Sequence, residues 1–386
     1  MSKSIYVHIP FCSRRCDYCD FATWVDKSDL VGTYIDSVIT QWKYHLVADE
    51  LSKDEEIKSI FFGGGTPNFI DPKYICRILE QINDACSISS SAEITLESNP
   101  DHVNEAAMKK YIAGGVNRIS MGVQSTQEHV LEYLGREHKR ENVYRSIETI
   151  RTAGINNFNC DLIYGSPVES ISDWELTLNE IIELSPTHIS AYALGIEKGT
   201  PLDQDIKLGK KATTLEDDLS DKYELCDQIL ENASYGWYEI SNWSKPDFES
   251  KHNLTYWVGG DVIALGCASH GTTNNKRWST PRHIETYIQK IQNLESDPTG
   301  FFIDQTADNN EQHKQEKFAL LMRTNIGYEW PRDFNSEKLN EYRELKMLTL
   351  DKFTNRLVLT TKGKLLAHRI IIDLYEELAN AGYVVE

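Results

Sequence analysis

Short runs of β-branched and aromatic residues alternate with amphipathic segments through the first half of the chain. The runs are bounded by polar or turn-forming residues, which is typical of strands, whereas the segments between them repeat apolar residues with the period of a helix. We therefore predict six strands, at Ser4–Pro10, Ile57–Phe62, Ala92–Glu97, Val116–Val123, Asn157–Tyr164 and His188–Leu194. The predicted helices that follow them are Leu30–Leu51, Asp71–Ala85, Asn104–Ala113, Glu128–Leu134, Glu141–Ala153 and Ser172–Leu184.

Turn-forming and capping residues mark the ends of several of these helices. Pro72 suits a first helical turn, Gly114-Gly115 and Gly154 follow helix ends, and Ser172 is a candidate N-cap. Repeated strand–helix units indicate an α/β fold with a parallel sheet, whose active site lies at the carboxyl ends of the strands. Because a closed barrel of this type needs eight units, we predict a partial (β/α)6 barrel, with an open doubly wound sheet as the alternative.

The alternation stops near residue 200, and the second half has a different order of elements. A charged helical stretch at Thr214–Ala233 is followed by the aromatic-rich segment Tyr235–Trp257 and by the apolar run Asp261–Gly271. We therefore predict two domains, one of residues 1–200 and one of residues 201–386.

The end of the chain has the element order of a winged helix. Helices are predicted at Glu316–Met322 and Ser336–Leu348, a strand pair around Phe353–Leu359, and a last helix at Lys362–Leu378. Winged helices often bind nucleic acid, but the local charge is not strongly basic. We expect this α+β module to pack against the rest of the chain or a protein partner rather than to bind DNA.

The composition is that of an acidic globular protein. Of 386 residues, 40% are hydrophobic and 26% are charged, and the formal net charge is −19. So acidic a chain does not suit general binding of nucleic acid or anionic membranes. No apolar run approaches the about 20 residues that span a bilayer, and the start of the chain lacks the apolar stretch of a signal peptide. We therefore expect a cytoplasmic protein with no integral membrane segment and no nucleic-acid partner.

Three of the eight cysteines lie close together near the N-terminus. Cys12, Cys16 and Cys19 form a C-x3-C-x2-C array directly after the first predicted strand. In a reducing compartment such a group more often binds metal or does redox chemistry than forms disulfides. The other cysteines lie in or beside apolar runs, and we expect them to be buried core residues: Cys76, Cys86, Cys160, Cys226 and Cys267.

Three thiolates suit an iron–sulfur cluster better than zinc. A [4Fe-4S] cluster usually takes four cysteines, so three of them leave one iron free to accept nitrogen and oxygen atoms of a small molecule. Structural zinc sites need four ligands and commonly include histidine. His8 is near in sequence but belongs to the predicted strand, which makes zinc the weaker alternative.

The cysteine array and the residues before it, Tyr6-Val7-His8-Ile9-Pro10-Phe11-Cys12, resemble the signature of the radical S-adenosylmethionine (SAM) superfamily. The stretch is typical of the branch that contains oxygen-independent coproporphyrinogen oxidase and the HemW-type haem chaperones. The resemblance implies that Cys12, Cys16 and Cys19 hold a [4Fe-4S] cluster whose unique iron binds the amino and carboxylate groups of SAM. In that superfamily, one-electron reduction cleaves SAM to a 5′-deoxyadenosyl radical.

Further candidate SAM contacts follow the ends of successive predicted strands. The turn Gly63-Gly64-Gly65-Thr66-Pro67 follows the second strand, where glycine lets the backbone approach a ligand and offer its N–H and C=O groups. Glu97, Gln124 and Asp161 lie at later strands, and Arg136 follows a short helix. Asp161 is expected either to accept from ribose hydroxyls or to pair with Arg136. Carried over by resemblance, the SAM contacts are Tyr6, Gly64, Gly65, Thr66, Glu97, Gln124, Arg136 and Asp161, with Tyr18 and Ala193 as further candidates.

Two features separate the oxidase from the chaperones within this branch. The oxidase carries a fourth cysteine, in C-x3-C-x2-C-x-C, where this chain has Phe21. The segment His252-Asn253-Leu254-Thr255-Tyr256-Trp257 fits the H-N-x-x-Y-W motif of the HemW-type proteins. A histidine can ligate haem iron while tyrosine and tryptophan rings supply an apolar wall. The candidate ligand of haem b is therefore His252, and the alternatives are His8, His270 and Cys267.

The resemblance implies a chaperone that binds a [4Fe-4S] cluster, SAM and haem and delivers haem to haem-dependent proteins, typically respiratory ones. The rival is an enzyme that uses the radical for porphyrinogen decarboxylation, against which Phe21 and the H-N-x-x-Y-W segment argue. The sequence leaves open whether SAM is cleaved in turnover. Arg14-Arg15 lies inside the cysteine loop of an acidic chain. The pair is expected to bind either an acidic electron donor such as a flavodoxin or the propionates of haem. The alternative is that both side chains are simply solvated.

Overall fold

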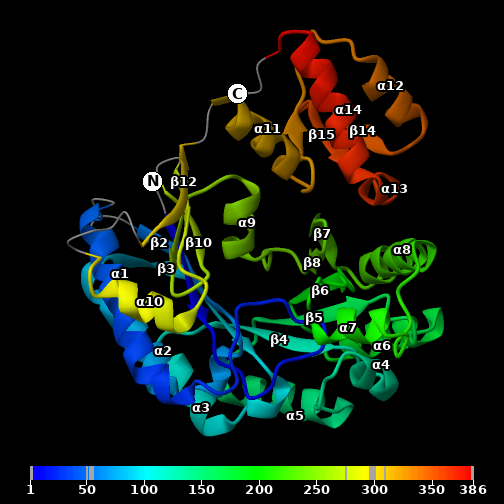
Figure 1. Ribbon diagram of the computed structural model, residues 1–386. Coiled ribbons are helices and arrows are strands. Elements are labelled where there is room, and N and C mark those ends of the chain that lie inside the picture. The colour runs from blue at the N-terminus through cyan, green and yellow to red at the C-terminus, as the bar shows by residue number, and fades with distance from the viewer. Residues whose placement is uncertain are drawn as a thin grey trace.

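The computed structural model describes residues 3–48, 51, 56–273, 276–294, 301–307 and 310–383. Its centre is a curved sheet in which consecutive strands of the first half run parallel (Figure 1). These strands are β1 (Lys3–Ile9), β2 (Glu56–Gly64), β3 (Ser87–Ser98), β4 (Arg118–Gln124), β5 (Phe158–Tyr164) and β6 (His188–Ala193). The predicted strands and the predicted α/β fold with a partial barrel are confirmed.

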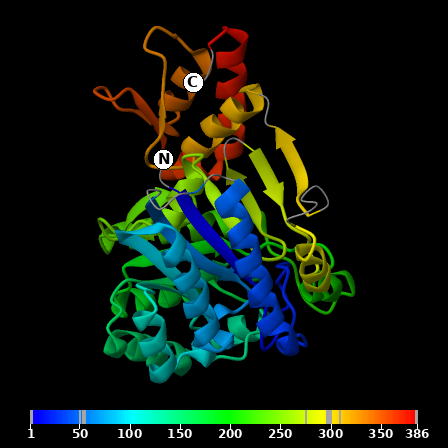
Figure 2. The ribbon, with the colours of Figure 1, turned by 90° about the vertical axis from the view of Figure 1, so that its left-hand side faces the viewer.

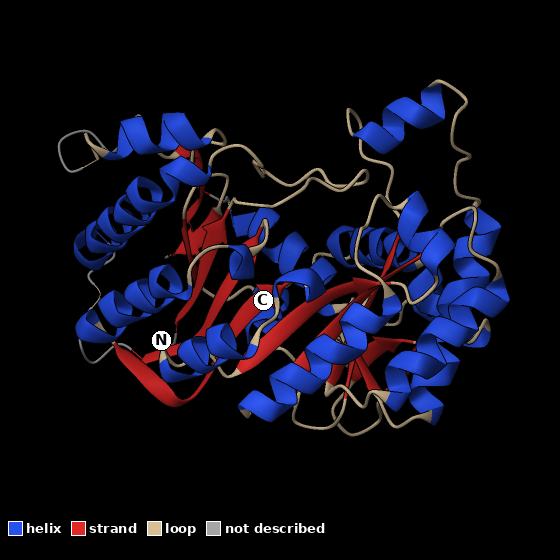
Figure 3. Cartoon of the chain, turned by 90° about the horizontal axis from the view of Figure 1, so that it is seen from below, coloured by secondary structure: helices blue, strands red, loops and turns tan. Residues whose placement is uncertain are grey.

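The helices that connect these strands lie on the outer face of the curved sheet (Figure 3). They are α1 (Val31–Ala48), α2 (Pro72–Ala85), α3 (Glu105–Ala113), α4 (Glu128–Tyr133), α5 (Arg140–Ala153) and α6 (Ile171–Glu183). The predicted cap of α6 was wrong. Ser170 is the N-cap, because its hydroxyl accepts from the Asp173 N–H at 3.1 Å while the Asp173 carboxylate accepts from the Ser170 N–H, and Ser172 lies inside the helix.

The two faces of the parallel sheet differ in polarity because side chains alternate along each strand. In β5, Phe158 and Cys160 are fully buried in the core under the helices, whereas Asn159 and Asp161 point to the inside of the curve. We call this inner space the lumen. Its lining from β1 to β6 consists of Tyr6, Phe61, Glu97, Arg118, Ser120, Asn159, Asp161, His188, Ser190 and Tyr192.

The sheet continues past residue 200 at both ends. Beside β1 lies β9 (Val262–Leu265), which is also parallel, followed by β10 (His270–Thr273), β11 (Lys276–Ser279) and β12 (Ile303–Ala307). Beside β6 lie β8 (Asn242–Ser244) and β7 (Gly236–Glu239). The main core likewise runs from Ile5 to Phe302, and the domain boundary near residue 200 stays a prediction.

Four further helices accompany this part of the chain: α7 (Pro201–Lys207), α8 (Glu216–Asn232), α9 (Lys251–Trp257) and α10 (Ile284–Ile291). Short 3-10 helices lie at Ser28–Leu30, Pro67–Phe69 and Pro100–His102. Across the part of the chain that the structure describes, no helix combines the length and the apolar character needed to cross a membrane.

The segment for which a winged-helix-like module is predicted has its own core, and the winged-helix likeness stays a prediction. The segment contains α11 (Asn310–Leu321), β13 (Tyr328–Glu329), α12 (Glu337–Glu344), β14 (Leu348–Leu350), β15 (Arg356–Leu359), α13 (Thr361–Leu365) and α14 (Ala367–Asn380). Figures 1 and 2 show the module beyond α9 and the β7–β8 edge. A buried ion pair joins it to the body, because Lys364 Nζ lies 2.7 Å from Asp227 Oδ2 on α8.

Candidate cofactor site

The cysteine loop follows β1 and is bonded to its neighbours. All three of its thiols are free; Cys12 is buried, and Cys16 and Cys19 are partly exposed. Thr66 Oγ1 lies 3.5 Å from Cys12 Sγ, which ties the loop to the glycine-rich turn. Burial, together with the two neighbouring thiols, raises the pKa of Cys12 to about 11.

The three thiols can be compared with the ligand sets of known metal centres. In the described ranges, no three His, Cys, Asp or Glu side chains are grouped as they are around a single metal ion. The ligands of a [4Fe-4S] cluster bind different irons and need no common centre. The donor set therefore fits the cluster that the sequence predicts.

A clamp that the sequence analysis missed holds the middle of the loop. Lys211 Nζ lies 2.8 Å from Asp17 Oδ2 and donates to the Tyr133 carbonyl at the same distance. Gly135 packs on Asp17 with φ +69°, and a Cβ there would lie 2.6 Å from the carboxyl carbon. Only glycine therefore fits this position. No local pattern reveals the clamp, because Asp17 and Lys211 are 194 residues apart in sequence.

The guanidinium of Arg136 faces a thiol rather than a carboxylate. Its Nη1 lies 3.1 Å from Cys16 Sγ, and its Nη2 donates to the Gly122 carbonyl at 2.9 Å. The predicted alternative of an Arg136–Asp161 pair is not formed, because these bonds take up the guanidinium. The guanidinium thus lies directly against one sulfur of the cysteine loop.

The glycine-rich turn after β2 packs tightly on the cysteine loop. Gly64 has φ +111°, and a Cβ there would lie 2.3 Å from the His8 ring. The N–H groups of Gly64, Gly65 and Thr66 donate to Glu97 Oε2, to the Ile9 carbonyl and to the Phe11 carbonyl, respectively. Since these donors are occupied within the protein, the turn does not offer the N–H groups that the sequence analysis expected.

Two carboxyl groups lie in the lumen below this turn. Burial and the neighbouring Asp161 raise the pKa of Glu97 to about 8. Burial also raises the pKa of Asp161, whose carboxylate accepts from Ser120 Oγ at 2.9 Å and from Asn159 Nδ2 at 2.8 Å. A bound cation would favour the charged forms of both groups. The pair therefore fits the sulfonium cation of SAM.

The remaining predicted SAM contacts differ in their surroundings, and of these only Tyr6 is among the residues that line the lumen pocket. Gln124 is buried at the end of β4 and has a left-handed backbone with φ 68°, a strained conformation of a kind that often marks functional sites. Tyr6 lies deeper, with its hydroxyl 3.0 Å from His8 Nδ1. Tyr18 lies in the cysteine loop near Arg136, which favours its charged form and so lowers its pKa, although burial raises that pKa overall. Ala193 is exposed at the end of β6.

The H-N-x-x-Y-W segment lies at the other end of the lumen, where it forms α9. The Glu93 carboxylate accepts from Ser250 Oγ and from the His252 N–H, which fixes the start of α9 near the amino ends of the strands. His252 is 3% exposed and stacks on Phe61, with the ring centroids 5.1 Å apart. The lumen pocket that it lines has a volume of about 200 Å³, below the roughly 300–1,000 Å³ of most ligand pockets.

The protonation of His252 follows from its neighbours. Ser59 donates its hydroxyl hydrogen to Ser4 Oγ at 2.8 Å, so it accepts from His252 Nδ1 at 3.0 Å. The lone pair is then on Nε2, which has no partner within the described residues. Burial lowers the pKa of His252 to about 3, so the ring is neutral.

The alternative haem ligands have different surroundings. Both ring nitrogens of His8 are bonded, to the Tyr6 hydroxyl and to the Ala22 carbonyl. Cys267 is fully buried, and burial raises its pKa to about 12. His270 is exposed.

The sequence analysis also missed the polar residues at the amino ends of the strands. They are Ser59, Glu93, Arg118, Asn159 and His188, and all are buried. The signal was present as alternating polar residues within the predicted strands, which is the pattern of a sheet whose inner face is polar.

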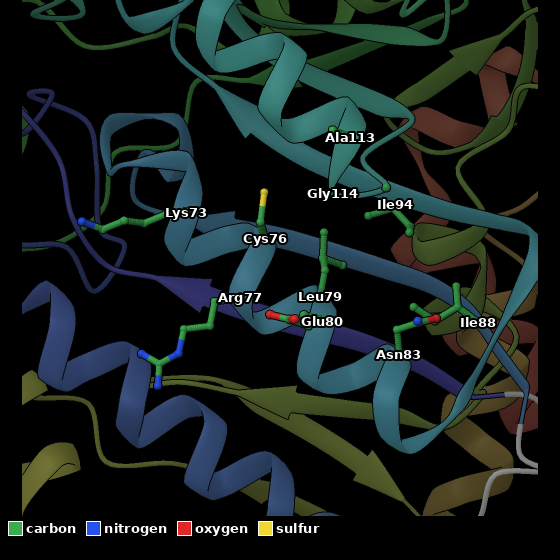
Figure 4. A pocket seen from close by; sticks show the side chains of 11 residues that line it. Lys73, Cys76, Arg77, Leu79, Glu80, Asn83, Ile88, Ile94, Ala113 and Gly114 are labelled. Carbon is green, nitrogen blue, oxygen red and sulfur yellow. The ribbon is translucent and has the colours of Figure 1, made fainter.

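Four of the five other cysteines are buried, as expected, but Cys76 is only partly buried. It borders a surface hollow of about 710 Å³ between α2, α3 and β3 (Figure 4). Gly114 lies opposite its thiol and has no side chain to cover it. This hollow lies outside the barrel and contains none of the predicted site residues.

Comparison with known proteins agrees with this geometry. Residues 6–181 match the model of the radical SAM superfamily. The chain is 31% identical to the heme chaperone HemW of Mycobacterium tuberculosis (strain CDC 1551 / Oshkosh), over 96% of this chain and 94% of the relative. It is 32% identical to the heme chaperone HemW of Bacillus subtilis (strain 168), over 83% of this chain and 84% of that protein.

A solved structure shares the fold. Coproporphyrinogen III oxidase (HemN) from Escherichia coli, a radical SAM enzyme, superposes with a TM-score of 0.80 over 97% of this chain and 90% of the oxidase, at 20% identity. The identity to the heme chaperones extends over nearly the whole chain, and it decides between the chaperone and the oxidase branches of the superfamily. The chain therefore belongs to the HemW family of the radical SAM superfamily.

Proposed function

We propose that the protein holds a [4Fe-4S] cluster and SAM at the carboxyl ends of the strands, and that it carries haem b for delivery to haem-dependent proteins, respiratory ones among them. The observation that carries the proposal is the loop of three free thiols, set beside a guanidinium and above two lumen carboxylates. The similarity to heme chaperones over nearly the whole chain supports the haem-carrying part.

In this proposal Cys12, Cys16 and Cys19 are the cluster ligands. Arg136 lies against one of them, with its Nη1 atom 3.1 Å from Cys16 Sγ. The Lys211–Asp17 bond holds the loop in place. A bound cluster would supply one-electron reduction to SAM held beside it.

The SAM site extends from the cysteine loop into the lumen. The Glu97 and Asp161 carboxylates favour a cationic ligand there. The N–H groups of the glycine-rich turn are already bonded within the protein. In this proposal the turn therefore binds the amino group of SAM through its carbonyl groups. The proposed contacts are Tyr6, Tyr18, Gly64, Gly65, Thr66, Glu97, Gln124, Arg136, Asp161 and Ala193.

For haem, His252 is the proposed ligand of the iron. Its ring is neutral and has a free lone pair on Nε2, which is the state that ligates iron. Because the side chain is only 3% exposed, haem reaches it only if α9 moves away from the barrel. The exposed His270 is the alternative.

An acidic electron donor such as a flavodoxin would approach the exposed side of the cysteine loop. Two arginines lie there: Arg15 donates to the Cys19 carbonyl at 3.2 Å, and Arg14 forms an ion pair with Glu137. Unchanged cluster reduction and haem affinity after charge reversal at both arginines would contradict a role for them.

A second candidate is a porphyrinogen-decarboxylating radical enzyme, which the shared fold with the E. coli oxidase favours. Phe21 argues against it, because it stands where the oxidase motif has its fourth cysteine, and its side chain is 67% exposed. Efficient consumption of coproporphyrinogen III by the reconstituted protein would favour this candidate over the chaperone.

One experiment tests the proposal: anaerobic reconstitution followed by parallel haem titration, SAM-cleavage and coproporphyrinogen assays. Replacing Cys12, Cys16 or Cys19 by Ala should abolish the cluster absorbance and leave the fold intact, with Cys76→Ala as the matched control. His252→Ala should weaken haem binding and keep the cluster, and His270→Ala tests the alternative ligand; the exposed His368 on α14 gives the control variant His368→Ala. Full iron content in the cysteine variants would refute the cluster ligands, and an unchanged haem titration of His252→Ala would move the haem ligand elsewhere.

A further inference from the structure

An unbroken series of side-chain hydrogen bonds connects α9 with the lumen carboxylate of Asp161. Asn253 Nδ2 donates to the Tyr238 hydroxyl at 3.3 Å, and that hydroxyl lies 2.8 Å from His188 Nε2. His188 Nδ1 lies 2.7 Å from Asn159 Oδ1, and the Asn159 amide nitrogen donates to Asp161 Oδ1 at 2.8 Å. The second residue of the H-N-x-x-Y-W segment is thus linked to a proposed SAM contact.

The donors and acceptors of this series have a single consistent arrangement. Asn159 must turn its NH2 group to Asp161, since a carboxylate only accepts, so its oxygen faces His188. His188 therefore carries its proton on Nδ1, and its Nε2 accepts from the Tyr238 hydroxyl. That hydroxyl in turn accepts from Asn253. Reversing any one bond would leave two donors or two acceptors facing each other.

The middle of the series is buried, and Asn253 at its end has a second partner. His188 and Tyr238 are each 1% exposed, and Asn159 is 2% exposed. The Asn253 NH2 group also donates to Glu239 Oε1 at 3.2 Å, so two β7 residues orient this end of the amide. In surroundings of low dielectric, hydrogen bonds are strong and an unpaired group is costly. We therefore expect a change at Asn253 to alter the bonds of Tyr238 and His188, which are shielded from water.

We propose that Asn253 is a positioning residue for SAM: through Tyr238, His188 and Asn159 it fixes the orientation of the Asp161 carboxylate, and α9 is thereby the floor of the SAM compartment. The inference rests on the proposed function, since it requires that Asp161 contacts SAM. It gives the asparagine of the segment a role at the end of the lumen opposite the cysteine loop.

Asn253→Asp is the most direct test, because it preserves size and replaces the amide donor with an acceptor. The Tyr238 hydroxyl should then donate to the new carboxylate, and His188 should move its proton from Nδ1 to Nε2. Nitrogen-15 NMR of histidine-labelled, cluster-reconstituted protein reports this tautomer directly. The affinity for SAM should fall about fivefold, the effect of losing about one hydrogen bond.

Two further variants complete the test. Tyr238→Phe removes the hydroxyl with little change of volume and should lower SAM affinity similarly. Asn325→Asp is the matched control. Among the described residues, the bonds of Asn325 go to the backbone of neighbouring β7: its side chain donates to the Trp237 carbonyl and its N–H donates to the Tyr238 carbonyl. This variant should keep the tautomer of His188 and the affinity for SAM.

Several results would overturn the inference. A wild-type His188 protonated on Nε2 would do so without any variant. The inference would also be refuted if the Asn253→Asp and Tyr238→Phe proteins fold and bind SAM with an affinity within twofold of the wild-type affinity. Unchanged SAM binding by Asp161→Asn would instead refute the proposed SAM contact, and the His188 tautomer would still show whether the series exists.

Discussion

Binding of SAM should release a proton from Glu97. Burial and the nearby Asp161 raise the pKa of this carboxyl group to about 8 in the free protein. At pH 7, one unit below that value, about nine in ten molecules hold the proton. SAM brings a sulfonium cation, and a nearby cation favours the ionised form of a carboxyl group. The proton therefore leaves when SAM binds.

The size of the effect on SAM binding follows from the pKa of Glu97. Below pH 8 the affinity for SAM should rise with pH, approaching tenfold per pH unit, because only the ionised fraction of Glu97 suits the cation. Near pH 7 wild type should release about 0.9 more protons per SAM than Glu97→Gln, which has no proton to lose. The amino group of SAM can lose a proton too, but that contribution is common to both proteins.

Titration calorimetry in two buffers of different ionisation enthalpy measures the released protons. Glu105→Gln serves as a control, because Glu105 is an exposed carboxylate on α3 that pairs with Lys109. Equal proton release by wild type and Glu97→Gln, or the same pH dependence of SAM affinity in both, would refute the reasoning.

Two further predictions concern stability. Burial raises the pKa of Glu239 from 4.5 to about 7, so the folded state binds the proton more tightly than the unfolded state between these values. Relative to Glu239→Gln, wild type should lose about 3 kcal/mol of unfolding free energy as the pH rises from 4.5 to 7. Urea denaturation at a series of pH values measures this, and an equal change of unfolding free energy with pH in the two proteins would contradict it. The second stability prediction concerns the buried ion pair. Lys364→Met should lower the free energy of unfolding by about 3–5 kcal/mol, because it leaves the Asp227 carboxylate buried without its cation. Lys364→Met with Asp227→Asn should recover most of that loss in chemical denaturation, and a double variant as unstable as the single one would show that the pair is not the cause.

The sequence predicts the parallel strands well, because each is a local pattern. It also predicts the cluster loop, since Cys12, Cys16 and Cys19 are neighbours in the chain. The partners of these residues were harder to predict. Arg136 pairs with a thiol instead of Asp161, and Asp17 is held by a lysine 194 residues away. Local spacing carries no information about such contacts, because they depend on how α4 and the segment after α7 pack on the loop.

By itself, the sequence determined which chemical groups are present and which strand each of them follows. A loop of three cysteines, a turn that only glycine can form and a carboxylate at a strand end are consequences of residue type and short spacing. Only the tertiary structure decided that β9 lies beside β1, and that the H-N-x-x-Y-W helix closes the lumen opposite the cysteine loop. The physical reason is that these arrangements come from pairing and burial between distant segments. His252 was predicted from its aromatic neighbours, but its burial follows from Phe61, Ser59 and Glu93, which belong to other strands.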